Sequence, residues 1–315
     1  MRAVWLKEFG GPEVLVTDQA PDPAPGPGQA LIEVVFANIT FVETQFRANG
    51  VGPFKPELPM IPGNGVGGLV TAVGPGADAA LVGRRVVSGT GGSGGYAERV
   101  AVDAAGVVQV PDGMELDTAV ALMADGRTAV LLVRRAEVRG GERVLVEAAA
   151  GGVGILLCQL ARAAGAQVVA AAGGPRKVQV ARDQGADVAV DYLEPGWTDA
   201  VGDVDVVFDG VGGDTARAAF DLLDPGGRMV SFGLASGAWA SVPEDAAAER
   251  GVTIVRLPRA TPEELRAATE TALAEGAAGR LRPVIGQRFP LDRAGAAHAA
   301  IESRATIGKT LLVAR

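Results

Sequence analysis

The segment best suited to chemistry is a glycine-rich turn after an apolar run, VLVEAAAGGVG at residues 144–154. The run predicts a buried strand, and the apolar residues 154–164 predict a helix. Glycines in such a turn let the backbone approach a pyrophosphate, and the helix N-terminus offers free N–H groups. The spacing departs from G-x-G-x-x-G, so a purely structural turn is the alternative. Strand, turn and helix together favour a dinucleotide site.

The end of the next apolar run bears on which dinucleotide would bind. Residues 169–177 are VAAAGGPRK, with no carboxylate where NAD-binding proteins usually place an acid on the ribose 2′-hydroxyl. Arg176 and Lys177 could instead bind a 2′-phosphate, which favours NADPH. The alternative is that both are ordinary surface residues at the start of a helix. A third run, residues 206–213, ends in small residues that leave room for a ligand, although Asp209 could simply cap the next helix.

Cysteine and histidine are too few for a zinc site. The chain has one cysteine, Cys158, and one histidine, His298, whereas a catalytic zinc usually takes three protein ligands and a structural zinc four. We predict no metal site, barring one made of carboxylates alone. Cys158 lies in an apolar helix and is interpreted as a small buried residue, not a nucleophile, and His298 is interpreted as structural. A lone cysteine also forbids an internal disulfide, which fits a reducing compartment.

Length and composition favour two domains. A chain of 315 residues with 48% hydrophobic residues exceeds the usual size of one domain and can fill two cores. The formal charge of −8 argues against a nucleic-acid surface, which needs clustered Lys and Arg. No apolar stretch reaches the roughly 18 residues of a membrane span, and the first residues lack the pattern of a secretory signal. We expect a soluble cytoplasmic protein with no nucleic-acid or membrane partner.

The character of the chain changes near residue 116. Before it, short β-branched runs cut by Gly and Pro predict a compact β-rich domain, with the glycine-rich residues 89–95 as a loop inside it. After it, strand and helix signals alternate, which implies parallel βαβ units buried on both faces. From residue 282 the pattern of short runs separated by Gly and Pro returns, with a predicted helix at 293–304 and a predicted strand at 310–313. This last segment could rejoin the first domain.

Several motifs in order give the chain a resemblance over nearly its whole length. They are GGYAE at 94–98, Thr128 with Ala129, the turn at 148–154, FDGVG at 208–212, GRMVSFG at 227–233, AHAAIESR at 297–304 and GKT at 308–310. With these motifs the chain resembles the zinc-free quinone oxidoreductases related to zeta-crystallin, in the medium-chain dehydrogenase/reductase superfamily. The resemblance implies an α/β protein, with a GroES-like β-rich domain from residues 1–118 and 283–315 and a Rossmann-fold nucleotide-binding domain at 119–282.

The resemblance also assigns a cofactor and the residues that would hold it. It implies NADPH, with its pyrophosphate lined by Gly151, Gly152, Val153 and Gly154. The residues implied around the 2′-phosphate are Gly173, Lys177 and Tyr192, with Arg176 beside them. Those implied near the nicotinamide are Thr128, Phe232, Gly233 and Leu234, and Lys309 matches a family lysine near the cofactor.

The polar residues expected around the substrate depart from the family pattern. The family's Asn-Phe-x-Asp element is replaced by Thr40-Phe41-Val42-Glu43, and its Pro-Gly-x-Glu turn by Pro62-Gly63-Asn64-Gly65. Thr40 is therefore the candidate catalytic residue, as a substrate-facing hydroxyl, with Phe41 and Asn64 in the substrate cleft. The proton for the reduced substrate would come from water.

Three functions fit this pattern. The first is NADPH-dependent reduction of quinones or related conjugated carbonyl compounds by hydride transfer without zinc. The second is an enoyl or enone reductase acting on an α,β-unsaturated carbonyl in a biosynthetic pathway. The third is a non-catalytic NADPH-binding protein. In the first two, catalysis would rest mainly on positioning the nicotinamide against the substrate in a dry cleft.

Self-association is expected from the resemblance. The apolar residues 252–255, VTIV, predict a strand at the edge of the nucleotide-domain sheet. An exposed apolar edge strand is an aggregation hazard unless it is covered. We expect a homodimer built on this edge, with a tetramer as the alternative.

Overall fold

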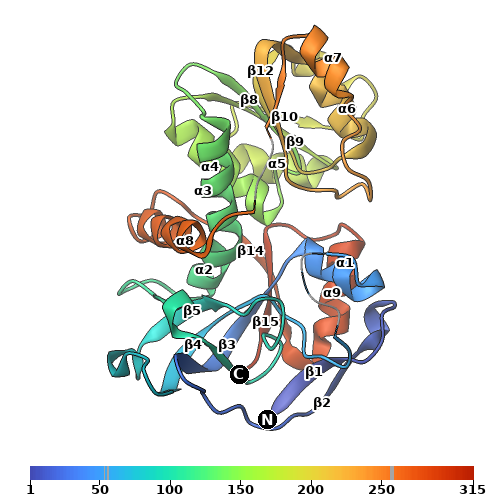
Figure 1. The fold of residues 1–315 in the computed structure, drawn as a ribbon. Helices are drawn as coiled ribbons and strands as arrows, with labels where there is room; N and C mark the ends of the chain where they lie inside the picture. The colour runs from blue at the N-terminus through green and yellow to red at the C-terminus, as the bar shows by residue number, and fades with distance from the viewer. Residues whose placement is uncertain (53, 55–56, 256–258) are drawn as a thin grey trace. The chain divides into compact units, whose positions relative to one another are not determined.

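The computed structural model describes residues 1–52, 54, 57–255 and 259–315. Its internal contacts define two compact units: unit 1 is Met1–Arg127 with Pro262–Arg315, and unit 2 is Thr128–Thr261. Both chain ends belong to unit 1, into which unit 2 is inserted (Figure 1). These boundaries differ from the sequence-based limits, because residues 119–127 and 262–282 group with unit 1. The assignment of a role to each domain stays a prediction.

Unit 1 is built on a mainly antiparallel sheet of seven strands among the described residues. Its order is β14-β15-β3-β4-β5-β7, and β6 pairs with β3. The strands are β3 Gln29–Ile39, β4 Gly65–Val73, β5 Arg85–Gly89, β6 Arg99–Asp103, β7 Val108–Gln109, β14 Ile285–Pro290 and β15 Lys309–Val313. A separate hairpin joins β1 Arg2–Leu6 to β2 Leu15–Gln19. The predicted return of the C-terminal segment to the first domain is confirmed, since β15 pairs with β3.

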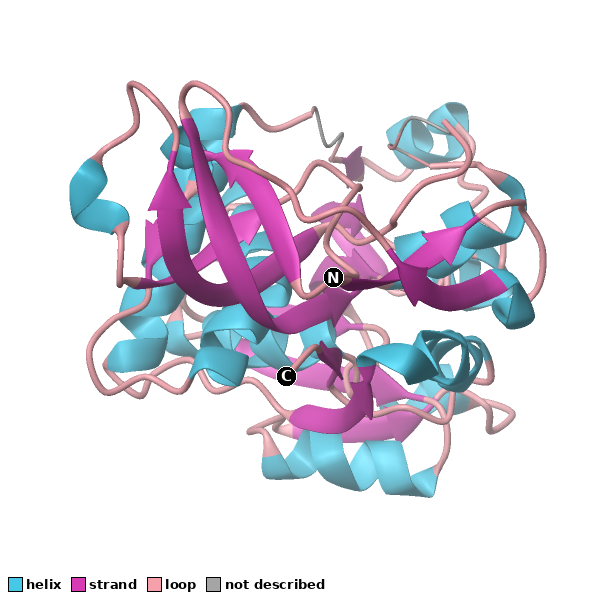
Figure 2. Cartoon of the chain, turned by 90° about the horizontal axis from the view of Figure 1, so that it is seen from below, coloured by secondary structure: helices cyan, strands magenta, loops and turns pink. Residues whose placement is uncertain are grey.

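The long strand β3 carries the core of unit 1. Its side chains alternate, so that Ala30, Ile32 and Val34 are fully buried while their neighbours are partly exposed. Two register shifts against β4, one of them between Leu31 and Ile32, bend the pair. Figure 2 shows the long strands of this sheet curved along their length. The curvature lets one sheet enclose its own core.

The helices of unit 1 include one irregular turn. They are α1 Phe41–Asn49, α2 Leu116–Ala121, α8 Pro262–Ala277 and α9 Ala294–Glu302, with short 3-10 turns at Pro12–Val14, Ala79–Leu81, Ala104–Gly106 and Leu291–Arg293. After α2 the chain makes a π-helical turn, Leu122–Gly126, and continues into α3 Arg127–Ala136. Turns of this kind are rare and often occur at functional sites.

Unit 2 is a parallel sheet in the Rossmann order. The strands are β8 Arg143–Val146, β9 Gln167–Ala172, β10 Val188–Asp191, β11 Val204–Asp209, β12 Leu223–Ser231 and β13 Thr253–Ile254. Their spatial order, β10-β9-β8-β11-β12-β13, is the 3-2-1-4-5-6 arrangement of dinucleotide-binding domains. The order reverses between β8 and β11, and ligands bind at such a switch point. The predicted Rossmann fold is confirmed.

Helices connect these strands, and the helix predicted at residues 154–164 forms as the first of them. They are α4 Gly152–Ala163, α5 Pro175–Asp183, α6 Gly213–Asp221 and α7 Glu244–Glu249, with a 3-10 turn at Trp197–Ala200. Pro175 at the first position of α5 suits the helix start, because proline has no N–H to lose there. The predicted edge strand at 252–255 forms at Thr253–Ile254, the Val255 N–H donates to the Met229 carbonyl at 2.8 Å, and Thr253 is exposed.

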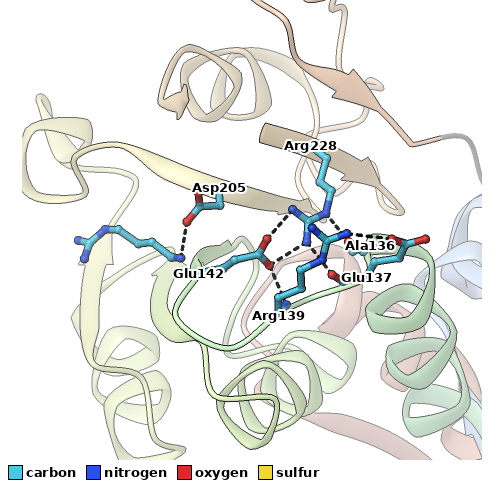
Figure 3. Close-up of polar contacts among 7 residues, drawn as sticks. Ala136, Glu137, Arg139, Glu142, Asp205 and Arg228 are labelled. Carbon is cyan, nitrogen blue, oxygen red and sulfur yellow. Dashed lines mark hydrogen bonds and ion pairs between the residues drawn. The ribbon is translucent and has the colours of Figure 1, made fainter. Parts of the chain in front are cut away.

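The amino-terminal edge of this sheet is fastened by one arginine. The Arg228 guanidinium donates to both carboxylate oxygens of Glu142 at 2.9 and 2.8 Å, and also to the carbonyls of Ala136 and Glu137 (Figure 3). Although burial opposes it, Arg228 lowers the pKa of Glu142. Beside this cluster, the Arg143 N–H donates to Asp205. Arg228 therefore links β12 to Ala136, Glu137 and Glu142 at the edge of the sheet opposite the expected cofactor site.

No helix in the described part of the chain combines the length and apolar character needed to cross a membrane.

Candidate functional site

The predicted cofactor residues of unit 2 gather along one edge of the parallel sheet. The turn before α4 follows β8, Gly173 follows β9, Tyr192 follows β10 and Phe232 follows β12. Because these strands are parallel, their carboxyl ends share one edge. The edge includes the β8/β11 switch point, where a dinucleotide is expected. Contact of each residue with a cofactor stays a prediction.

The glycine turn is shaped by close backbone packing. A Cβ at Gly154 would lie 2.3 Å from the Ala148 carbonyl oxygen and 2.8 Å from the Ala149 Cα, so no side chain fits there. Ala148 itself has a left-handed φ of 48°, a conformation that costs about 1–3 kcal/mol in a non-glycine residue. Such strain often occurs at ligand sites.

The first turn of α4 offers the donors that a pyrophosphate needs. Gly151 is the N-cap, with no side-chain hydrogen bond to the helix, and Gly151, Gly152 and Val153 are half-buried. The first N–H groups of a helix have no partner within it and point toward its N-terminal side. With no side chain at 151, 152 or 154, an anion can approach them closely. The turn therefore fits a phosphate group.

The expected 2′-phosphate region brings Gly173 and Tyr192 together. A Cβ at Gly173 would lie 3.0 Å from the Tyr192 hydroxyl oxygen, so the ring lies against this glycine. Lys177 is half-buried in the first turn of α5, and Arg176 next to it is exposed. The four residues thus lie at the ends of β9 and β10 and at the start of α5, and their contact with a 2′-phosphate stays a prediction.

One carboxylate in this region was not singled out from the sequence. Asp191, at the end of β10, accepts hydrogen bonds from the N–H groups of Gly174 at 2.9 Å and Leu193 at 3.0 Å. The sequence feature that could have pointed to Asp191 was its position at a strand end before a turn. Asp191 holds the Gly173–Gly174 turn in place, a role different from that of an acid at the end of β9.

The expected nicotinamide segment is tied to the end of β11. Phe232 and Gly233 donate their N–H groups to the Asp209 carbonyl at 2.9 and 3.3 Å. Ser236 N–H donates to the Val211 carbonyl at 2.7 Å, and Ala235 N–H to the Gly210 carbonyl at 3.3 Å. Phe232, Gly233 and Leu234 are half-buried. A Cβ at Gly233 would lie 2.6 Å from the Gly210 oxygen, so glycine is needed where the segments touch.

Two fully buried carboxylates lie beneath this segment, Glu147 at the end of β8 and Asp209 at the end of β11. Burial and the nearby charge of Asp209 raise the pKa of Glu147 well above its usual range. Asp209 does not simply cap α6: its Oδ1 accepts from the N–H groups of Val211 and Gly212, which precede the helix. The sequence reasoning missed Glu147, although a Glu between apolar strand residues and a glycine turn was a visible signal.

Thr128 and Lys309 belong to different units. Thr128 is half-buried in the first turn of α3, at the start of unit 2. Lys309, on β15 of unit 1, is buried, and its Nζ lies 2.9 Å from the Asp125 carboxylate in the π-helical turn. A buried ion pair therefore already engages the predicted cofactor lysine. Its contact with a cofactor stays a prediction.

The candidate catalytic residue Thr40 is part of a buried polar cluster in unit 1. The Glu43 carboxylate accepts from the Thr40 N–H and hydroxyl, each at 2.7 Å, and from the Asn64 N–H at 2.9 Å. Burial raises the pKa of Glu43, against the opposing effects of Thr40, Lys309 and Asn64. Phe41, like Thr40 and Asn64, is half-buried. The structure thus brings Thr40 and Asn64 together around one buried acid.

The position of the family's second acid is crowded by two side chains in this chain. A Cβ at Gly65 would lie 2.4 Å from Asn38 Nδ2 and 2.5 Å from Met123 Cε. The Asn38 side chain is buried, and its Oδ1 has no partner among the described residues. Asn38 and Met123 therefore fill the space that a glutamate at 65 would need, which explains the glycine there.

The lone histidine and cysteine have structural surroundings, as predicted. His298 Nε2 is 3.0 Å from the Tyr96 hydroxyl, and both side chains are buried. Burial, with the charge of Arg47, lowers the pKa of His298 to about 3. Cys158 is buried in α4, and burial raises its pKa to about 12. Among residues 1–52, 54, 57–255 and 259–315, no group of three or more His, Cys, Asp or Glu side chains could hold a metal ion.

Two family models match parts of the chain. Residues 26–112 match the alcohol dehydrogenase GroES-like domain, and residues 184–312 match the zinc-binding dehydrogenase model.

Curated proteins resemble the chain over its full length. The quinone oxidoreductase of Pseudomonas aeruginosa is 35% identical, with 99% of each chain covered. That of Rattus norvegicus is 34% identical, covering 99% of this chain and 98% of its own.

Solved structures also resemble the chain over its full length. The Escherichia coli quinone oxidoreductase complexed with NADPH has a TM-score of 0.91 at 31% identity, covering 99% of this chain and all of its own (100%). A mycobacterial protein complexed with NADPH has a TM-score of 0.90 at 34% identity, with 99% of each chain covered.

Proposed function

The chain belongs to the quinone oxidoreductase family of medium-chain dehydrogenases/reductases, and on this premise we propose that it transfers a hydride from NADPH to quinones or related conjugated carbonyl compounds. The observation that carries the proposal is the edge of unit 2, where the glycine turn, the Gly173 turn and the 232–236 segment meet the carboxyl ends of the sheet. Two relatives named above, both crystallised with NADPH, support the cofactor.

The residues of unit 2 suit each part of NADPH. The first turn of α4 would bind the pyrophosphate through N–H groups, because Gly154 leaves the backbone uncovered. Lys177 and Arg176 would bind the 2′-phosphate, and Phe232 to Leu234 would border the nicotinamide. When bound, the nicotinamide supplies the hydride. The protein's part is to hold it in one orientation and keep water away.

The polar cluster of unit 1 offers a proton for the reduced substrate. Burial raises the pKa of Glu43, and the Thr40 hydroxyl lies 2.7 Å from the Glu43 Oε2. We propose that Thr40 donates a proton to the substrate and regains one from Glu43. Replacing Thr40 by Val removes the hydroxyl but keeps the shape, and should lower kcat at saturating NADPH at least about tenfold. Thr40→Ser should restore most of it; equal rates in all three proteins would point to water as the donor.

Steady-state NADPH oxidation tests the substrate class. We expect turnover of 1,4-benzoquinone or 9,10-phenanthrenequinone. A panel of enones tests the second candidate, an enone reductase, which the Thr40–Glu43 pair favours because an enolate product needs a placed proton donor. Tight NADPH binding with no turnover of any compound would instead indicate a non-catalytic NADPH-binding protein.

The cofactor preference is tested at Lys177. The variant Lys177→Ala should weaken NADPH binding much more than NADH binding, because only NADPH carries the 2′-phosphate. Arg182→Ala, on the last turn of the same helix, is the matched control and should affect both cofactors little. Equal weakening of NADPH and NADH by Lys177→Ala would remove the 2′-phosphate assignment.

We further propose that the reaction needs no zinc. The chain has one cysteine and one histidine, and the surroundings of both are structural. Metal analysis of the purified protein should find no stoichiometric zinc, and a chelator should leave NADPH oxidation unchanged. One zinc per chain would overturn the proposal.

Homodimer formation through β13 and a cytoplasmic location are also proposed. In the described part of unit 2, β13 pairs on one side with β12 and ends the sheet, which supports a partner strand there. Sedimentation should give a dimer that Thr253→Pro converts to monomer; an unchanged dimer would place the interface elsewhere. The single cysteine supports a reducing compartment.

A further inference from the structure

Glu147 and Asp209 form a buried pair of acids at the switch point of the sheet. β8 and β11 are neighbours in parallel register, with Val146 opposite Phe208, so the next residues, Glu147 and Asp209, also lie side by side. Both side chains are fully buried at 0% exposure. Two ionised carboxylates in contact and away from water repel each other strongly, so such a pair retains a proton.

The hydrogen bonds around the pair leave room for one proton. Asp209 Oδ1 accepts from Val211 N–H at 3.0 Å and Gly212 N–H at 2.7 Å. Glu147 Oε2 accepts from Val211 N–H at 3.2 Å. The remaining oxygens, Glu147 Oε1 and Asp209 Oδ2, are buried with no partner among the described residues. A single O–H···O bond between the two side chains would satisfy both oxygens.

No positive charge compensates the pair within the described part of unit 2. Burial is the largest effect that raises the pKa of Glu147 and the charge of Asp209 is the second, while the backbone N–H groups of Val211 and Gly210 act in the opposite direction. The charged residues of the neighbouring elements are engaged elsewhere or exposed: Arg143 and Asp205 at the amino ends of β8 and β11, Arg162 near the end of α4, Asp214 and Arg217 on α6, and Arg228 on Glu142. A proton is therefore the remaining way to neutralise the second charge.

The pair is linked to the expected nicotinamide segment through one short stretch of backbone. Val211 N–H donates to both acids, and the Val211 carbonyl accepts from Ser236 N–H at 2.7 Å. The Asp209 carbonyl accepts from Phe232 and Gly233. Moving either acid would therefore move residues 209–213 and, with them, residues 232–236.

We propose that Glu147 is a positioning residue for NADPH: it carries a proton at neutral pH, donates it to Asp209, and so fixes residues 209–213 against the 232–236 segment. The proton is placed on Glu147 because Asp209 already accepts two N–H bonds at one oxygen. The inference rests on the proposed function, since the 232–236 segment positions a cofactor only if NADPH binds.

Infrared spectroscopy and two variants test this proposal. Glu147→Gln imitates the protonated acid, because its amide N–H can donate to Asp209 while its oxygen accepts from Val211. Glu147→Leu keeps a similar volume but can do neither. The wild-type minus Glu147→Gln difference spectrum at neutral pH should contain a protonated-carboxyl band that shifts in D₂O. The difference is needed because Glu43 is a second buried acid.

NADPH affinity supplies the second readout, by fluorescence titration. Glu147→Gln should bind NADPH within about threefold of wild type, and Glu147→Leu at least about tenfold more weakly. A missing band, a Gln variant as weak as the Leu variant, or a Leu variant as tight as wild type would overturn the proposal. If the Leu variant does not fold, the band and the Gln variant still decide. Wild-type protein that shows the band but binds no NADPH would refute the proposed function and leave the shared proton standing.

Discussion

Replacing Gly154 by alanine tests whether the glycine turn is shaped for a cofactor. The added methyl group would lie 2.3 Å from the Ala148 carbonyl oxygen and 2.8 Å from the Ala149 Cα. Both atoms are backbone and cannot rotate away, so either the first turn of α4 or the turn before it must move. The N–H groups expected to bind the pyrophosphate move with it.

Two opposing effects set the change in stability. Alanine favours a helix over glycine by about 1 kcal/mol. Overpacking usually costs about 1–3 kcal/mol, and overlap with rigid backbone belongs at the upper end of that range. We therefore expect Gly154→Ala to lower the free energy of unfolding by about 1–2 kcal/mol and to weaken NADPH binding at least about tenfold.

The matched control is Gly140→Ala, in the same unit. A Cβ there would lie 3.5 Å from the Ala164 oxygen, an ordinary contact. This variant should be about 0.4–1 kcal/mol more stable, because alanine has fewer unfolded conformations. Urea unfolding measures stability, and calorimetric titration measures NADPH affinity. If Gly154→Ala matched Gly140→Ala in both, the tight turn would have no part in binding and the reasoning would be wrong.

Three further predictions concern Cys158, His298 and Arg228. The Cys158 thiol, whose pKa is raised to about 12, should not react with a thiol reagent at neutral pH until urea unfolds the chain; fast reaction of native protein would contradict its burial. Because folding lowers the pKa of His298 from 6.5 to about 3, the unfolded chain binds more protons between these values. Stability should fall as pH falls through this window, by up to about 1.4 kcal/mol per pH unit, and His298→Gln should reduce this slope in acid-unfolding curves. Arg228→Ala should lower the free energy of unfolding by about 1–3 kcal/mol, measured with urea. Arg139→Ala, at an exposed ion pair, should change it by less than about 0.5 kcal/mol. Equal effects of the two variants would show that the Arg228 contacts do not stabilise the sheet edge.

Local sequence was enough to predict most of unit 2. The apolar runs at 144–146, 169–172 and 206–209 stand beside glycine turns, and each forms part of a strand. Periodicity and turn chemistry act over a few neighbouring residues, so they can be seen in the sequence.

Contacts between distant residues could not be predicted in this way. The Lys309–Asp125 ion pair, the Glu147–Asp209 pair and the packing of Asn38 against Gly65 all depend on how separate segments of the chain pack together. Thr40 was singled out for its hydroxyl, but the acid that binds it, Glu43, was noted only as a departure from a pattern. Burial, which gives Glu43 and Glu147 their chemistry, is a property of the folded units.

The pairing of β15 with β3 has a consequence for synthesis on the ribosome. Domains usually fold in the order in which they are made, yet unit 1 begins the chain and cannot complete its sheet until its last strand, Lys309–Val313, has been translated. Unit 2 is continuous, from Thr128 to Thr261, and can close first. Until then, the edge of β3 at residues 36–39, which pairs with β15, stays unpaired on the nascent chain. Chaperones that shield unpaired strands should therefore matter more for unit 1 than for unit 2.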